Sequence, residues 1–158
     1  MKIIYGVEAN YIIEEVPECK ELIEGETTIF DYHDSTFIYE TKEDASLAED
    51  LLREVGLFEN QTDLILVGEG EKGDTFFDFG MESSHGTYLL KELLCAFSIV
   101  RGNSDAIQMA TFQLQEHFIF KAESDIAAIY FAELHLQDLI EGIAVAYDIE
   151  VSFFELDK

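Results

Sequence analysis

Four histidines are the residues of this chain best suited to metal binding or acid–base chemistry: His33, His85, His117 and His135. Asp31 lies two residues before His33, which places both side chains on one face of a predicted strand. Asp138 follows His135 by three residues, the spacing of neighbours on a helix face. Neither pair repeats a Glu-x-x-His or His-x-x-x-His spacing, so the sequence predicts no metal ligand, no catalytic residue and no cofactor.

The segment Ser84-His85-Gly86 lies between a predicted strand and a predicted helix, where a nucleophilic serine can sit. The elbow that exposes such a serine needs glycine two residues earlier, and this chain has Glu82 there. A serine that caps the following helix is the simpler interpretation. The sequence therefore favours a non-catalytic protein, and a small metal-binding or hydrolytic enzyme using the His/Asp pairs is the alternative.

Gly68, Gly70 and Gly73 form the pattern G-x-G-x-x-G after the apolar run Leu64–Val67. In a dinucleotide site a helix follows these glycines, and its N-terminal amides hold the pyrophosphate. Here the aromatic run of residues 74–79 follows and predicts a strand. We therefore expect a β-hairpin in which the glycines form the turn.

The same run, from Leu66 to Phe79, resembles the glycine–aspartate hairpin of the SUKH immunity superfamily. The resemblance covers this one hairpin, and the helical pattern that follows differs from that family. No function is carried over from it.

The formal net charge is −25, from 34 acidic residues against nine Lys and Arg. Such a chain lacks the basic side chains that bind nucleic-acid phosphates or anionic lipids directly, whereas its field attracts a basic protein. Residues 1–82 hold 22 of the acids. The carboxylates expected to bind a partner are Glu14, Glu15, Glu18, Glu21, Glu43, Asp44, Glu49, Asp50, Glu69 and Glu71. The alternative is a solvated acidic surface that serves solubility and binds nothing.

Cys19 and Cys95 are the two cysteines, far apart in sequence, and are expected to be reduced structural thiols. The first apolar stretch is too short for a signal peptide, and no run reaches the length of a membrane span. We therefore expect a cytoplasmic protein.

Apolar periodicity predicts a single α+β domain over residues 1–158, with a β-rich acidic part (1–82), a helical part (83–148) and a closing strand (149–154). An antiparallel sheet from the N-terminal half is expected to pack against three to four helices, mostly C-terminal. The predicted strands are 2–7, 9–16, 27–32, 36–40, 64–67 and 74–79. The predicted helices are 42–55, 84–101, 104–118 and 124–147.

These features together predict a non-catalytic acidic binding protein that engages a basic protein, either a nucleic-acid-binding protein or a toxin. An inhibitor, an immunity protein or a nucleic-acid mimic of bacterial or phage type fits that description. A further alternative is a homodimeric adaptor whose last helix exposes Ile129, Leu136 and Ile140.

Overall fold

The helix α2 (Lys42–Glu54) forms where the sequence supplies signals at both ends. At its start, the backbone N–H of Asp44 donates to Thr41 Oγ1 over 3.2 Å, and the Thr41 hydroxyl donates to Asp44 Oδ2 over 3.0 Å. The chain leaves the helix at Gly56, whose φ of 74° suits glycine. The computed structural model, which describes residues 1–156, thus confirms the helix predicted over 42–55.

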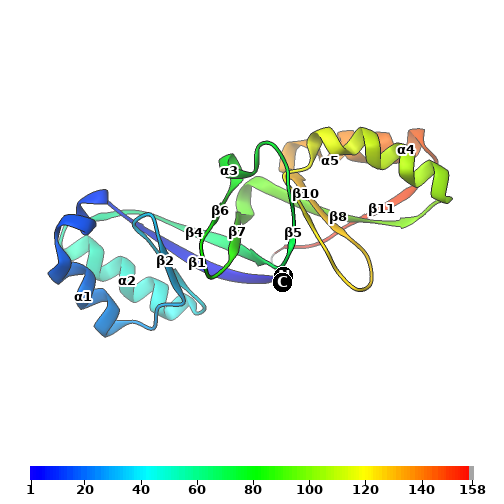
Figure 1. Cartoon of the computed structure of the whole chain (residues 1–158). Helices are drawn as coiled ribbons and strands as arrows, with labels where there is room; N and C mark the ends of the chain where they lie inside the picture. The colour runs from blue at the N-terminus through cyan, green and yellow to red at the C-terminus, as the bar shows by residue number, and fades with distance from the viewer. Residues whose placement is uncertain (157–158) are drawn as a thin grey trace. The chain divides into compact units, whose positions relative to one another are not determined.

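The chain forms two compact units (Figure 1). Unit 1 comprises residues 1–66 and 83–85, and unit 2 comprises the rest of the chain. Antiparallel sheets combine with helices, several of them C-terminal, so the predicted α+β class is confirmed. The single domain predicted over residues 1–158 remains a prediction.

Unit 1 is an antiparallel sheet, in the order β2-β3-β1-β4, covered by helices. Its elements are β1 (Lys2–Ala9), the 3₁₀ turn η1 (Tyr11–Glu15), α1 (Pro17–Glu26), β2 (Asp31–His33), β3 (Thr36–Tyr39), α2 and β4 (Phe58–Val67), whose last residue belongs to unit 2. The core joins Val7 and Phe37 of the sheet to Ile23 of α1 and Leu52 of α2. Burial of these apolar side chains fixes both helices on the sheet.

Unit 2 contains a five-stranded antiparallel sheet in the order β11-β8-β10-β9-β5, together with the β6–β7 hairpin. Its strands are β5 (Gly70–Lys72), β6 (Gly80–Glu82), β7 (Thr87–Leu90), β8 (Leu94–Arg101), β9 (Phe120–Ala122), β10 (Ile129–Glu133) and β11 (Glu150–Phe153). Its helices are α3 (Phe76–Phe79), η2 (Lys91–Leu93), α4 (Ser104–Leu114), η3 (Gln115–His117), η4 (Leu134–Leu136) and α5 (Gln137–Ala146). Leu114 of α4 and Ile140 of α5 pack against Phe97 and Tyr130 of the sheet.

Two of the predicted helices were wrong in whole or in part. Residues 84–101 form β7, η2 and β8, and the first part of the helix predicted over 124–147 is β10. The first five residues of β8 and the middle three of β10 are consecutively buried, so buried and exposed positions do not alternate there. Such a continuous apolar run does not distinguish a buried strand from a buried helix.

The helices predicted over 104–118 and the end of 124–147 exist as α4 and α5, and β11 lies within the predicted closing strand. The strand predicted over 9–16 was wrong: β1 ends at Ala9, and the Asn10 side chain accepts from the N–H of Ile12 and starts η1. Residues 18–23, for which the sequence indicates one helical turn or a loop, lie within the longer helix α1.

The hairpin predicted around Gly68–Gly73 was also wrong. β5 pairs with β9, and residues 76–79 form one helical turn. A Cβ atom on Gly70 would lie 2.3 Å from the carbonyl oxygen of Lys121, and one on Gly73 would lie 1.9 Å from that of Phe118. These two glycines are therefore explained by the close approach of this segment to β9.

Candidate functional site

The acidic residues expected to bind a partner divide between the two units. Glu14 and Glu15 lie on η1, Glu18 and Glu21 on α1, and Glu43, Asp44, Glu49 and Asp50 on α2, all in unit 1. Glu69 and Glu71 belong to unit 2. Unit 1 contains 17 acidic and four basic residues, and unit 2 contains 17 and five. Acidity is therefore a property of both units and does not by itself mark one site.

Three acids of α2 favour the stability of that helix, whereas Glu54 lies in its last turn, where the dipole disfavours negative charge. Glu43 and Asp44 occupy its first turn, where the helix dipole favours negative charge, and Asp44 also completes the N-cap. Glu49 forms an ion pair with Arg53 one turn later at 3.2 Å, and Arg53 in the last turn suits the negative end of the dipole. These three carboxylates need no partner to explain them.

In α1, Glu18 lies in the first turn, where the dipole favours it, but the acids further along the helix have no such support. Glu18, Glu21 and Glu24 recur every three residues and are exposed, so like charges face one another along the helix. Glu24 and Glu26 lie in the last turn, where the dipole disfavours negative charge and where α1 has no basic residue. Within residues 1–156, these four glutamates form no hydrogen bond or ion pair through their side chains.

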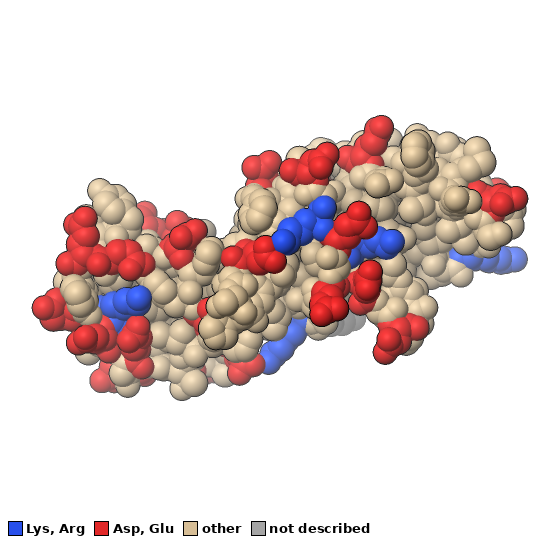
Figure 2. All heavy atoms as spheres, viewed as in Figure 1, with Lys and Arg blue, Asp and Glu red and all other residues tan. Residues whose placement is uncertain are grey.

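We call Glu18, Glu21 and Glu24, which recur every three residues along one side of α1, the α1 acidic face, and Glu26 lies two positions from Glu24 on the other side of the helix. In Figure 2, acidic side chains are frequent over the part of unit 1 that contains α1 and α2. Lys20, the single lysine of α1, forms no ion pair with these glutamates, and its Nζ lies 4.0 Å from the centroid of the Tyr32 ring. The Tyr32 hydroxyl in turn donates to Glu14. Burial and the hydrogen bond to Glu14 raise the pKa of Tyr32, so this phenol remains a neutral donor.

Glu71 has a different environment. It faces Lys121 across the β5–β9 pair and lines a cavity of about 300 Å³ that also contains Lys72. Lys72 forms an ion pair with Glu82. Positive charge is therefore present beside Glu71. Its environment differs in this respect from that of the α1 glutamates, which have no ion-pair partner among the described residues.

The predicted His/Asp pairs do not form. Nε2 of His33 lies 3.3 Å from Asp34 Oδ2, and Nε2 of His135 lies 3.5 Å from Glu133 Oε2. Within residues 1–156 there is no group of three or more His, Cys, Asp or Glu side chains that could hold a metal ion. The alternative based on these pairs consequently has no geometric support in the described part of the chain.

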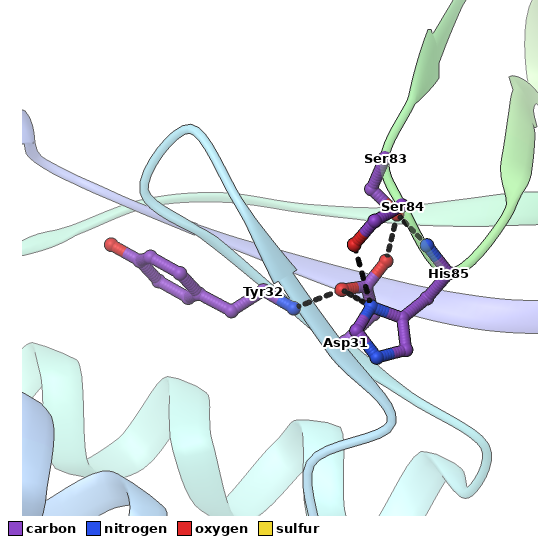
Figure 3. Close-up of polar contacts among 5 residues, drawn as sticks. All are labelled: Asp31, Tyr32, Ser83, Ser84 and His85. Carbon is purple, nitrogen blue, oxygen red and sulfur yellow. Dashed lines mark hydrogen bonds and ion pairs between the residues drawn. The ribbon is translucent and has the colours of Figure 1, made fainter.

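Asp31 instead meets residues from a distant loop of unit 1 (Figure 3). Its buried carboxylate accepts hydrogen bonds from the Ser83 hydroxyl and from the backbone N–H of Tyr32, the latter over 2.7 Å. Nδ1 of His85 lies 3.5 Å from Asp31 Oδ1 and 3.2 Å from Ser84 Oγ. In a serine hydrolase the aspartate and the serine bind opposite nitrogens of the imidazole. Here both contact Nδ1, so the imidazole cannot pass a proton between them.

This cluster was not predicted. The sequence suggested that Ser83 or Ser84 caps a helix, but β7 follows instead. Ser83 Oγ does accept the N–H of His85 over 3.0 Å, which is a capping-type contact made within a turn. Nothing local in the sequence links this turn to Asp31, so the contact required the fold.

The described helices are all too short or too polar to cross a membrane. No family model, curated protein or solved structure matches this chain.

Proposed function

We propose that this protein is a non-catalytic binding protein that engages a basic protein through the α1 acidic face. The observation that supports this proposal is the uncompensated charge of α1. Its glutamates repel one another, oppose the helix dipole at the C-terminal turn and have no ion-pair partner among residues 1–156. Residues that break local stability rules without a structural gain are expected at functional sites.

A basic partner would reduce both the repulsion between the α1 glutamates and their unfavourable interaction with the helix dipole. Lys or Arg side chains near Glu24 and Glu26 would supply the positive charge that the end of α1 lacks. The field of a chain with net charge −25 would also speed the encounter, and added salt would slow it. Inhibition of a nucleic-acid-binding protein, by occupying its basic groove, and neutralisation of a basic toxin are two activities consistent with this chemistry.

The test is affinity capture from a lysate of the source organism with three immobilised proteins. The first is the wild-type chain, and the second carries Glu18→Lys, Glu21→Lys and Glu24→Lys on α1. The third carries Glu123→Lys, Asp125→Lys and Glu141→Lys, three exposed acids of unit 2. The second and third differ from wild type by the same net charge.

We expect one basic protein to be retained by wild type and by the unit 2 variant, lost by the α1 variant, and released as salt rises. Equal loss from both variants would mean that total charge rather than the α1 face drives binding. If the wild-type chain captures no basic protein, the proposal is wrong.

A further inference from the structure

The outer side of α1 carries uncharged residues in a row beside its glutamates. Glu18, Glu21 and Glu24 form one row with a spacing of three residues. Leu22 and Gly25 have the same spacing and follow Glu21 and Glu24 by one position each. Residues three apart form ridges on a helix surface, with grooves between them. The acidic row and the uncharged row therefore run side by side along α1.

Leu22 places apolar surface among these carboxylates. Its side chain is 47% exposed, whereas Ile23, the next residue, is 1% exposed and holds α1 on the core of unit 1. Glu18 and Glu26 lie four residues before and after Leu22, and both are exposed. The exposed part of Leu22 thus lies between two acids and contributes nothing to the core.

Gly25 leaves the backbone of α1 bare one turn beyond Leu22. A glycine inside a helix lowers its stability relative to alanine. A Cβ atom on Gly25 would meet no atom within 4 Å, and its φ is not positive, so neither packing nor backbone conformation requires glycine. What the glycine provides is room for another molecule to approach the helix backbone closely.

The two rows together restrict the chemistry of the partner. Charge complementarity selects basic side chains opposite the glutamates. The row of Leu22 and Gly25 selects an apolar ridge, which would cover the exposed leucine surface and fill the space above the glycine. A helix with a basic side and an adjacent apolar side presents both at residues three and four apart.

We propose that the basic partner docks on α1 through an amphipathic helix, whose Lys or Arg residues contact the α1 acidic face while its apolar residues pack on Leu22 and on the backbone at Gly25. The helix belongs to the basic protein that the proposed function requires, so the inference rests on that function. It adds that uncharged residues of α1 contribute to the affinity.

The apolar surface that the sequence suggested for a homodimer offers no comparable site. Ile140, one of its three residues, is fully buried in unit 2, and Ile129 and Leu136 are partly buried. The helix predicted to expose them is interrupted by β10 and η4. A dimer through these three residues is therefore not supported.

Fluorescence anisotropy with two labelled synthetic peptides tests the inference. Both peptides are helical and carry the same number of lysines along one side. The first has leucines on the adjacent side, and the second has alanines at the same positions. We expect the leucine peptide to bind the wild-type chain about 10-fold more tightly than the alanine peptide, because only the leucines add apolar burial to the same charge.

Leu22→Gln and Gly25→Gln test the uncharged row without changing the net charge. Each should weaken binding of the leucine peptide by about 10-fold. Gly25→Gln should also raise the melting temperature, because glutamine favours a helix more than glycine does, so weaker binding would not reflect unfolding. The matched controls are Leu139→Gln and Gly142→Gln on α5, since Leu139 is 44% exposed and a Cβ on Gly142 would also meet no atom within 4 Å.

Weaker binding in the α1 variants alone supports the inference. Equal affinity of the wild type for the two peptides, no binding of either peptide, or an equal effect of the α5 variants overturns it. The variant with Glu18→Lys, Glu21→Lys and Glu24→Lys separates this failure from that of the proposed function. If the peptides bind equally and the charge-reversed variant binds neither, charge alone drives binding and the proposed function stands. If that variant binds both peptides as the wild type does, the α1 acidic face is not the site and both proposals fail.

Discussion

The hydroxyl of Ser83 donates a hydrogen bond to the carboxylate of Asp31, which lies 52 residues earlier in the chain (Figure 3). The same carboxylate accepts the N–H of Tyr32 and lies 3.5 Å from Nδ1 of His85. One buried acid at the start of β2 thus holds the Ser83–His85 loop. This acid serves structure, in contrast to the exposed acids of α1.

Asp31→Ala is therefore expected to destabilise the protein. The substitution leaves the Ser83 hydroxyl and the Tyr32 N–H without their acceptor, which costs about 1 to 3 kcal/mol. Asp50→Ala is the control, because Asp50 is an exposed aspartate on α2, which belongs to the same unit. Urea denaturation of both variants measures the difference. An Asp31→Ala protein as stable as Asp50→Ala would show that the buried contact contributes nothing.

Reversing charge at the end of α1 should stabilise unit 1. Glu24→Lys and Glu26→Lys replace acids in the last turn with bases, and each is worth about 0.3 to 1 kcal/mol through the helix dipole. Glu43→Lys, in the first turn of α2, should have the opposite sign. Thermal unfolding at low salt measures both, and the two effects should shrink as salt rises. Destabilisation by the α1 substitutions would remove the conflict between charge and stability on which the proposed binding face depends.

Local signals predicted the parts of the fold that are determined locally. Thr41, Asp44 and Gly56 mark α2 because capping and left-handed backbone conformations depend on a few adjacent residues. The hairpin of β2 and β3 was predicted for the same reason, from the short turn at His33-Asp34-Ser35 between the strands predicted over 27–32 and 36–40, although β2 begins only at Asp31. Asp34 and Ser35 both have positive φ, as hairpin turns require.

Apolar patterns whose conformation depends on tertiary contacts led to wrong predictions. Leu94 to Ser98 of β8 are buried on both faces, and their apolar residues coincide with helical spacing. Only the pairing of β8 with β10 and β11 decides the conformation, and that pairing involves residues 30 or more positions away. The link between Asp31 and Ser83 was missed for the same reason. The charge of α1 was visible in sequence, but its conflict with the helix became apparent only once α1 was seen to be a helix.

The two glycines beside β9 make a prediction about unit 2. In Gly73→Ala the new methyl group would lie 1.9 Å from the carbonyl oxygen of Phe118, so the backbone just after β5 must move away from the residues just before β9. We expect a loss of at least about 2 kcal/mol, typical of overpacking against rigid backbone. Gly68→Ala is the control, since its methyl group would meet no atom within 4 Å. Equal stability of the two variants, by urea denaturation, would refute the close approach.

The buried phenol of Tyr39 is expected to make the stability of unit 1 fall at high pH. Burial is the main cause that raises the pKa of its phenol from 10.0 to about 12, although its hydrogen bond with Thr27 acts the other way. The folded state therefore favours the neutral phenol, and the stabilisation is complete below pH 10. It is lost as the pH rises from 10 to about 12, because the unfolded chain ionises first. A difference of this size corresponds to about 2 to 3 kcal/mol. Urea denaturation between pH 9 and about 12 should show a steeper decline for wild type than for Tyr39→Phe, which has no phenol to ionise, and parallel curves would contradict this assignment.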